Sequence, residues 1–389
     1  MTGFDFPPPV MPPGVEALRA EVRAFLAQSQ AEEGWRPDSD FGSDWSASFS
    51  RALGARGWIG MTWPAAYGGH ERSALERYVV IEELLAAGAP VYAHWVADRQ
   101  SGPLLLRFGS EAQRRAILPR IAAGGCYFAI GMSEPDSGSD LASVRTRAVR
   151  SGDGWRIDGT KVWTSNAHRS HYMIALCRTG PAGESRHEGL SQFLIDLEGD
   201  GVEVNPIVNL AGKHDFNECV FDGVTIPADR LIGREGDGWR QVTGELALER
   251  SGPERILSTF HLLAALVEAA GPAPEPRLAE AIGRLVAEFY ALRAMSLAVA
   301  GRLEAGALPD VEAAIVKDMG TRFEAEVAET LRRAVPLEPV AGDRDGAGGN
   351  APSLASALGA SVLGLPSFTL RGGTNEILRS IIARGLGVR

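Results

Sequence analysis

The chain has 389 residues, 45% of them hydrophobic, and a net charge of −10. This length and composition support two or three domains with apolar cores, and the negative charge excludes a basic surface for nucleic acid or an anionic membrane. No apolar run reaches membrane-spanning length, and the three cysteines lack metal or redox spacing, which favours a reducing cytoplasm.

The N-terminal third is predicted to be a helical domain covering residues 1–125. Val15, Leu18 and Val22 begin an apolar repeat at helical spacing, and similar repeats follow up to about residue 125. The segment "GWIGMTWPAAYGGH", residues 57–70, interrupts them. It is too rich in glycine and aromatic residues for a helix, so a tight loop with buried tryptophans is expected there.

From residue 126 to residue 235 the apolar period changes to two, which predicts a β domain, most simply a β-barrel. The segments "MIALCR", "SQFLIDL" and "NECVFDGVTIP" are typical of strands. Two Asp-Gly pairs, Asp153-Gly154 and Asp158-Gly159, predict hairpin turns.

Residues 236–389 return to helical spacing, and long helices joined by short loops predict an antiparallel four-helix bundle. "GPAPEP" at residues 271–276 is expected to be a rigid loop between helices, and "AGDRDGAGGNAP" at residues 341–352 a low-complexity connection. The expected fold class is therefore mainly α with a central β domain.

One stretch carries recognisable chemistry, "FAIGMSEPDSGSDLASVRTRA" at residues 128–148. A short apolar strand leads into small hydroxyl residues and turn formers around Gly138, which permits backbone angles that other residues resist. Backbone N–H groups and serine hydroxyls can converge there on an anion or a carbonyl. Such donors suit the charged pyrimidine side of a reduced flavin. The alternative interpretation is a polar turn between strands.

Within this stretch, "GMSEPDSGSD" resembles the T-E-P-x-x-G-S-D signature of acyl-CoA dehydrogenases, with Ser133 where the family usually has threonine. Further segments resemble family motifs in family order over nearly the whole chain. They are residues 57–70, residues 108–119, "WTSN" at residues 163–166, residues 221–233 and the terminal "LRGGTNEILRSIIARGLG".

The resemblance implies FAD as cofactor and assigns its contacts by position. The matching residues are Ile130, Met132, Ser133, Ser139, Trp163, Ser165, Thr374 and Glu376. A core tryptophan and the cap of an amphipathic C-terminal helix are the structural alternatives for Trp163 and Thr374.

The catalytic base is the main departure from the family pattern. Many members place a glutamate immediately before the terminal Gly-Thr, but Gly372 stands there. A second family arrangement, L-x-x-E-R, matches "LALER" and points to Glu249, followed by Arg250. At about 100° per residue, Glu249 falls within about 60° of Val242 and Leu246, on the apolar stripe of its helix, where desolvation raises a carboxyl pKa. An ordinary ion pair within the helix is the alternative.

The resemblance therefore implies dehydrogenation of an acyl-CoA thioester to a 2-enoyl-CoA, with proton abstraction by Glu249 and hydride transfer to FAD. Ser139, Arg250 and the backbone N–H of Gly372 are the residues expected near the substrate. The resemblance also implies an electron-transfer flavoprotein as acceptor and a homo-dimer, homo-tetramer or hetero-oligomer.

Two other functions stay open. A flavin oxidase or monooxygenase of the same fold needs no α-proton base, which agrees with Gly372. A non-autonomous subunit of a heteromeric dehydrogenase agrees with the adenine end of the flavin site, because the family's R-x-x-F-G and Q-x-x-G-G segments are unrecognisable here. His168 and His171 are three residues apart but have no accompanying ligand pattern, so no metal is expected.

Overall fold

The computed structural model describes residues 4–37, 44–249, 252–340 and 353–388, with the backbone alone for residues 245–249. The chain divides into two compact units, and both are discontinuous in sequence. The helical unit comprises Met1–Asp44, Arg72–Val91 and Glu249–Arg389, and the sheet unit comprises Trp45–Glu71 and Tyr92–Leu248.

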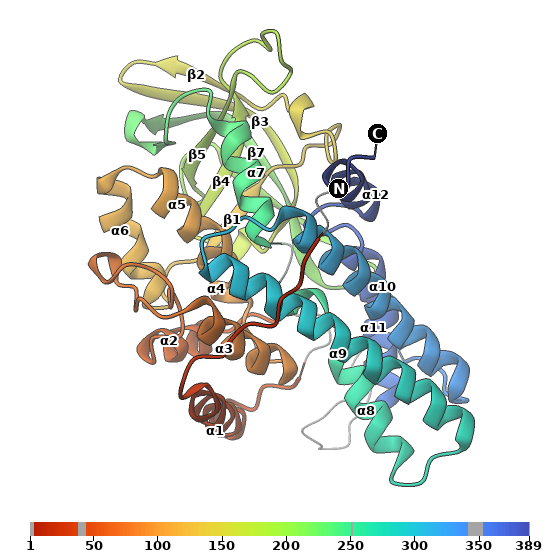
Figure 1. The fold of residues 1–389 in the computed structure, drawn as a ribbon. Coiled ribbons are helices and arrows are strands. Elements are labelled where there is room, and N and C mark those ends of the chain that lie inside the picture. Colours follow the sequence, from red (N-terminus) through yellow and green to blue (C-terminus); the bar gives the residue numbers. More distant parts are fainter. Residues whose placement is uncertain (1–3, 38–43, 250–251, 341–352, 389) are drawn as a thin grey trace. The chain divides into compact units, whose positions relative to one another are not determined.

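Eight strands build the sheet unit (Figure 1), and they form one sheet in the order β6-β7-β3-β2-β4-β5-β8, with β1 parallel to β4. The bounds are β1 (Phe128–Gly131), β2 (Arg147–Ser151), β3 (Gly154–Ser165), β4 (Tyr172–Arg178), β5 (Leu190–Asp196), β6 (Val202–Val208), β7 (His214–Pro227) and β8 (Leu231–Ile232).

The sheet curls around one apolar core. Burial alternates along most of β7, so every second side chain enters that core. Trp155 of β3 meets Phe193 of β5 edge to face, with ring centroids 5.0 Å apart, although two strands separate β3 from β5 in the sheet. Side chains of strands that are not neighbours therefore share one interior, as expected of a barrel-like sheet.

One sequence expectation for the sheet fails locally, and one strand was not expected. Asp158-Gly159 is not a turn but lies inside β3, where the pairing with β7 shifts register between Ile157 and Gly159. Gly159 has φ 148°, and a Cβ there would lie 2.6 Å from the Thr146 hydroxyl, so glycine allows a bulge with close backbone approach. β6 was not predicted, because its exposed residues and Pro206 do not resemble a buried strand.

The sheet unit also contains helices and the aromatic connection at residues 57–70. Trp58 and Trp63 are buried, as predicted for this connection. A capping box at Ser110 and Gln113 begins the last helix before β1. The bounds are α2 (Ala47–Ala55), α4 (Tyr92–Val96), α5 (Gly102–Phe108), α6 (Glu111–Ala122) and α7 (Gly238–Glu249), with short helical turns η1 (Ala65–Tyr67), η2 (Ala97–Ser101), η3 (Leu141–Ser143), η4 (Ala167–Arg169) and η5 (Ala228–Arg230).

The helical unit contains the predicted bundle, formed by α8 to α11 (Figure 1). Pro276, the last residue of "GPAPEP", is the first residue of α9, a position where the missing N–H of proline breaks no hydrogen bond of the helix. The bounds are α1 (Val15–Glu33), α3 (Ala74–Ala86), η6 (Pro253–Arg255), α8 (Phe260–Ala270), α9 (Pro276–Glu304), α10 (Asp310–Ala334), α11 (Leu354–Phe368) and α12 (Asn375–Gly385). The predicted fold class is confirmed.

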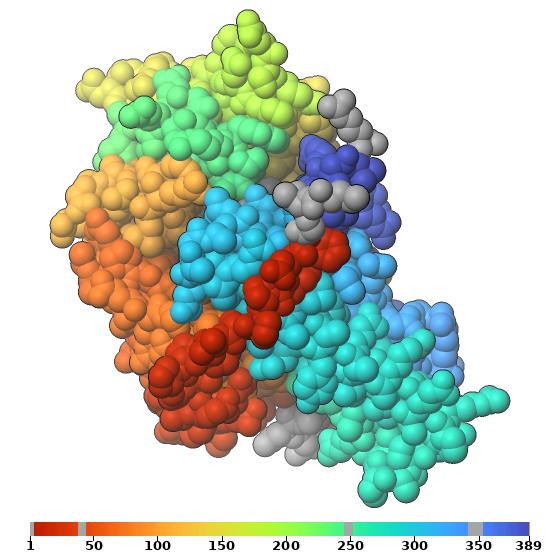
Figure 2. Space-filling model, viewed as in Figure 1, coloured from red at the N-terminus to blue at the C-terminus, as the bar shows by residue number. Residues whose placement is uncertain are grey.

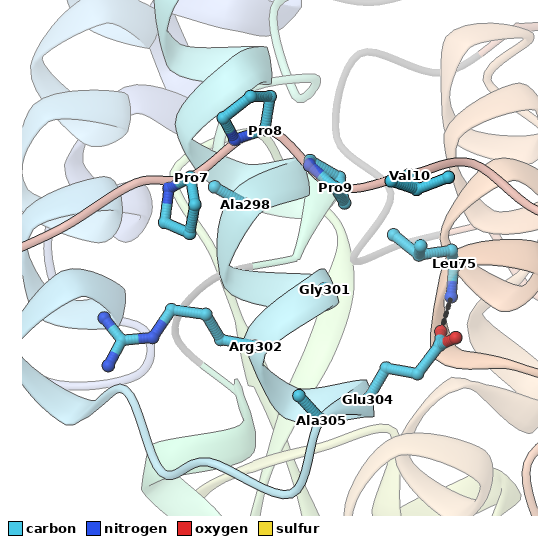
Figure 3. Close-up of a pocket in the computed structure, with 10 residues that line it drawn as sticks. All are labelled: Pro7, Pro8, Pro9, Val10, Leu75, Ala298, Gly301, Arg302, Glu304 and Ala305. Carbon is cyan, nitrogen blue, oxygen red and sulfur yellow. Dashed lines mark hydrogen bonds between the residues drawn. The ribbon is translucent and has the colours of Figure 1, made fainter.

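A proline-rich N-terminal segment crosses the surface of α9, where Figure 2 shows it as a red band. Pro9 packs so closely on Gly301 that a Cβ there would lie 2.7 Å from it. Figure 3 shows Pro7 to Pro9 over α9 beside a groove of about 410 Å³, at whose edge Glu304 accepts a hydrogen bond from Leu75 N at 3.1 Å. The segment therefore belongs to the packed surface of the helical unit.

The three cysteines are free and buried. Burial raises the pKa of Cys126 to about 11 and the pKa values of Cys177 and Cys219 to about 12. Within the described residues, no helix combines the length and the apolar character needed to cross a membrane.

Candidate active site

The predicted flavin loop follows β1 directly and closes as a tight turn. Glu134 N donates to Ser137 O at 2.7 Å, and Ser137 N donates back to Glu134 O at 3.0 Å. Gly138 is not among the glycines with positive φ, so the expectation that this turn uses glycine's special angles is wrong. Ser139 is exposed beyond the turn, and Asp140 forms an ion pair with Arg186.

A buried ion pair holds the flavin loop from behind. Lys161 Nζ lies 2.8 Å from Glu134 Oε1 and 3.1 Å from Met132 O, and the Lys161 side chain is fully buried. Glu134 also accepts the N–H groups of Arg145 at 2.6 Å and Thr146 at 2.9 Å. Burial alone would raise the pKa of Glu134, but the Lys161 charge and these hydrogen bonds hold it below its usual value. The carboxylate therefore remains ionised and fixes both ends of the loop.

Trp163 lies next to this loop in a strained conformation. The pairing of β3 with β7 shifts between Lys161 and Thr164, and Trp163 has φ 58°, a left-handed angle that costs a non-glycine residue about 1–2 kcal/mol. Trp163 is 59% exposed. Val162 N donates to Ser133 O at 2.9 Å, so the "WTSN" segment and the flavin loop are neighbours. The structure thus brings Ser133 next to the segment that contains Trp163 and Ser165.

The terminal motif forms a loop that is anchored within the helical unit. Gly372 and Gly373 have φ 69° and 98°. Fully buried Lys317 of α10 donates to Gly373 O at 2.8 Å and to Thr369 O at 3.4 Å. Arg371 lies 3.2 Å from Glu324 Oε2, on the same helix as Lys317. Lys317 therefore fixes carbonyl groups of this loop, and the ion pair between Arg371 and Glu324 fixes a side chain of the loop to α10.

Thr374 and Glu376 lie together at the start of α12. Thr374 is the N-cap, its Oγ1 accepting from Ile377 N at 3.5 Å, as the structural alternative predicted. The exposed Glu376 carboxylate has a lowered pKa because its own backbone N–H and the Thr374 hydroxyl bind it. Both side chains thus have a structural role in capping this helix.

Glu249 is the last residue of α7, and only its backbone is described. Arg250 lies outside the described residues. Val242, one of the two residues that define the predicted apolar stripe, is buried and packs near Met132. The helix ends before Pro253, which starts η6, so proline begins a new helical turn there.

The two histidines that were considered as metal ligands have separate partners. His171 Nδ1 accepts from Tyr127 N at 3.0 Å. His168 instead stacks on His214, with ring centroids 3.8 Å apart. In the part of the chain that the structure describes, no three metal-type side chains gather at one point.

Sequence profiles of the three acyl-CoA dehydrogenase domains match this chain. The N-terminal domain matches residues 13–125, the middle domain residues 129–224 and the C-terminal domain residues 236–387. The chain belongs to the acyl-CoA dehydrogenase family. It is therefore an oxidoreductase that acts on acyl-CoA thioesters.

Relatives of this dehydrogenase support the assignment along its length. The acyl-CoA dehydrogenase FadE29 of Mycobacterium tuberculosis is 32% identical over 95% of this chain and 96% of its own. The acyl-CoA dehydrogenase IpdE1 of the same organism is 36% identical over 73% of this chain and 77% of its own.

Two solved structures share its fold closely. The Tcur3481-Tcur3483 steroid ACAD has a TM-score of 0.85 and 30% identity, covering 98% of this chain and 99% of that one. The ChsE4-ChsE5 complex from Mycobacterium tuberculosis has a TM-score of 0.80 and 28% identity, with coverage of 98% and 99%.

FAD is the cofactor of this family, and the residues of the dehydrogenase's sheet unit fit its flavin ring. Among the described residues, the hydroxyls of Ser133, Ser139 and Ser165 form no hydrogen bond within the chain, and Trp163 is exposed in the segment that contacts Ser133. Hydroxyl donors and one aromatic face are groups that a flavin ring can use.

Sequence reasoning missed the residues that hold these loops from behind. Glu134 belongs to the quoted loop motif, and Lys161 precedes "WTSN" by two residues, but their separation of 27 positions gives no local sign of a pair. Lys317 and Glu324 lie on an amphipathic helix, where a charged side chain normally faces solvent. The only signal in the sequence was a charged residue at a position that the apolar spacing of its helix or strand predicts to be buried.

Proposed function

We propose that this dehydrogenase converts an acyl-CoA to a 2-enoyl-CoA, with Glu249 as the base that accepts the α proton. Gly372 is the observation that carries the proposal, because it occupies the usual position of the base at φ 69°, where a side chain is disfavoured. The base must then come from another element. Glu249, in the L-x-x-E-R segment at the end of α7, is the candidate.

The remaining roles follow from the chemistry of the reaction. The carboxylate of Glu249 takes the α proton, and the hydride leaves the β carbon with its electron pair. FAD, when bound, supplies the acceptor for that hydride. Ser133, Ser165 and Trp163 would hold its ring, with Ile130 and Met132 beside them. Thr374 and Glu376 at the start of α12 are also proposed as cofactor contacts.

We assign substrate binding to Ser139, Arg250 and the N–H of Gly372. The N–H groups of a loop can stabilise the charge that develops on a thioester oxygen when the α proton leaves. Lys317 supports this role because it fixes the carbonyl of Gly373, next to Gly372. The loop would thus be set before substrate arrives.

The proposed substrate class is a bulky, steroid-derived acyl-CoA. Support comes from the relative named a steroid ACAD, which is 30% identical over almost the whole chain. The electrons would pass to an electron-transfer flavoprotein. We place the reaction in the cytoplasm because the cysteines are free thiols.

The second candidate is a subunit that needs a homologous partner to complete its FAD site. The ChsE4-ChsE5 structure is described as a complex and aligns with 98% of this chain. Co-expression with a homologous subunit tests this candidate against a homo-dimer or homo-tetramer. Flavin retained only after co-expression supports the heteromer, and stable flavin in the chain purified alone argues against it.

Anaerobic titration of the flavin-loaded protein with acyl-CoAs tests the reaction and its base together. We expect a steroid-type acyl-CoA to bleach the visible flavin band of the parent protein, and Glu249→Gln to bleach at least about 100-fold more slowly. Glu245→Gln, one helical turn upstream, is the matched control and should bleach like the parent. Equal rates in the parent and Glu249→Gln would remove Glu249 as base. Rapid reoxidation of the bleached flavin by air would favour an oxidase.

A further inference from the structure

Asn217 of β7 joins two histidines to the bulged segment of β3. Its Nδ2 donates to Thr164 O at 3.0 Å, while its Oδ1 lies 3.2 Å from His168 Nδ1 and 2.7 Å from His214 Nε2. The Asn217 side chain is fully buried, and the two imidazoles stack with an interplanar angle of 16°. Side chains from η4 and β7 therefore meet at one amide.

The hydrogen-bond partners fix the orientation of every member of this cluster. A carbonyl oxygen can only accept, so the amide atom that faces Thr164 O is the nitrogen of Asn217. The amide oxygen then faces both rings, and the two ring nitrogens must carry hydrogen. His168 is therefore protonated at Nδ1 and His214 at Nε2. We refer to His168, Asn217 and His214 as the amide clamp.

The amide clamp acts on the segment that would contact the flavin. Thr164 lies between Trp163 and Ser165, and it is the direct pairing partner of Asn217 across the two strands. Trp163 also meets Phe216, the neighbour of Asn217, edge to face at 5.9 Å. A left-handed φ such as that of Trp163 persists only where the surroundings hold it. β7 supplies that hold at Thr164 O and at the indole.

We propose that Asn217 is a positioning residue for the flavin-contacting segment Trp163–Ser165, and that His168, stacked on His214, makes this positioning sensitive to acid. The proposal rests on the proposed function, because that function places the flavin ring at Trp163 and Ser165. A proton added to His168 would be opposed by the charge of Arg169 and by the His214 ring stacked 3.8 Å away. Acid would therefore separate the rings and release the amide that holds Thr164.

Charged groups around the rings also oppose protonation of His168. Burial, the neighbouring His214 and the charge of Arg169 lower the pKa of His168, and together they outweigh the hydrogen bond to Asn217, which raises it. Asp215 follows His214 on β7, and its carboxylate accepts a hydrogen bond from Asn209 Nδ2 at 2.6 Å. The other charged residues close by in sequence or on the packed strands are Lys213, Glu218, Glu203 on β6 and Lys161 on β3, the last paired with Glu134.

The first test uses hydrogen–deuterium exchange of the flavin-free protein at pH 7.5 and pH 5.5, corrected for intrinsic exchange. We expect peptides that cover residues 163–166 to exchange at least about tenfold faster at the lower pH. The double variant His168→Asn and His214→Gln keeps an N–H donor at each position but cannot titrate, so it should lose this dependence. His187→Gln, which removes an imidazole stacked on Trp239 elsewhere in the sheet unit, is the control and should keep it.

The second test measures FAD affinity at pH 7.5. Asn217→Asp keeps an acceptor for both rings but removes the donor to Thr164 O, so we expect about tenfold weaker FAD binding. Melting followed by circular dichroism checks that each variant folds. If Asn217→Asp does not fold, the double variant and the exchange experiment still decide the proposal.

Each outcome has one meaning. Exchange at residues 163–166 that does not change with pH, or that changes equally in the double variant, overturns the acid-sensitive clamp. Parent-like FAD affinity in Asn217→Asp overturns the positioning role if Trp163→Phe does weaken FAD binding. Parent-like affinity in both variants instead overturns the flavin role of this segment, which belongs to the proposed function.

Discussion

The flavin loop of the sheet unit and the terminal loop of the helical unit are both fixed by buried charge, but with opposite sign. In the sheet unit, the Glu134 carboxylate accepts backbone N–H groups and is itself paired with Lys161. In the helical unit, the Lys317 ammonium donates to backbone carbonyls of Thr369 and Gly373. A carboxylate that binds N–H groups therefore orders one loop, where Lys161 also holds the Met132 carbonyl, and a cation that binds carbonyl groups orders the other.

The difference teaches which backbone groups each loop offers to a ligand. In the flavin loop the carboxylate occupies the N–H groups of Arg145 and Thr146, and serine hydroxyls are the donors proposed for the flavin. A loop whose carbonyl groups are bound by a cation is set up to use N–H groups, which is the role proposed for Gly372. The sign of the buried charge thus distinguishes the loop that is proposed to face the flavin from the loop that is proposed to face the thioester.

The largest expected effect comes from breaking the pair in the sheet unit. Lys161→Met leaves Glu134 buried without its cation and should lower the free energy of unfolding by about 3 kcal/mol or more. Urea denaturation of the flavin-free protein measures this loss. Lys213→Met, on the turn between β6 and β7, is the matched control and should change stability by less than about 0.5 kcal/mol. A loss below about 1 kcal/mol in Lys161→Met would mean that the pair does not order the loop.

Breaking the anchor of the terminal loop should cost less, because the hydrogen bonds from Lys317 to Thr369 and Gly373 are made to neutral carbonyl groups. Lys317→Met should lower the free energy of unfolding by about 1–3 kcal/mol. FAD absorption should be retained while the affinity for acyl-CoA falls, as titration of the visible band would measure. A loss of FAD with unchanged affinity for acyl-CoA would reverse the roles assigned to the two loops.

Backbone strain gives a smaller and more specific signature. Both Trp163→Gly and Trp163→Ala remove the indole, but only glycine adopts φ 58° freely. The glycine variant should therefore be more stable than the alanine variant by about 1 kcal/mol in urea denaturation. The same pair of changes at Val149, an exposed position of β2, should give the usual order with alanine more stable. The usual order at residue 163 would argue against strain there.

The smallest effect is a dependence of stability on pH. The pKa of His168 is lowered in the folded state, so the unfolded chain takes up protons first as the pH falls. Stability should be constant above about pH 6.5 and should decrease by up to about 1 kcal/mol as the pH falls below that value. Urea midpoints at pH 7.5, 6.5 and 5.5 measure this decrease, and the double variant His168→Asn and His214→Gln should reduce it. A stability that increases toward pH 5.5 would have the wrong sign.

The order of a helical region, a β region and a second helical region was predicted well from the sequence alone, because the spacing of apolar residues is a local property. Strand β4 and the helices on both sides of the "GPAPEP" loop follow directly from it. The predicted domain bounds at residues 125 and 235 remain a proposal. That residues 45–71 pack with the sheet rather than with α1 was not predictable, since it depends on contacts distant in sequence.

Only part of the candidate site could be predicted from the sequence. Motif positions located Ser133, Trp163 and Gly372, but not the groups that fix them. Asn217 is 53 residues from Thr164, so no local pattern relates them. The turn predicted at Asp158-Gly159 was wrong because a pair that favours a tight turn also permits a bulge within a long strand.

The three buried thiols have a practical consequence for studying assembly. With pKa values of about 11 to 12, Cys126, Cys177 and Cys219 stay protonated and enclosed at neutral pH. Alkylating dyes should therefore leave the native protein unlabelled. A single cysteine introduced on the exposed surface would be the only reactive one, and fluorescence from a dye at that position could report the arrival of a partner subunit without any cysteine being removed first.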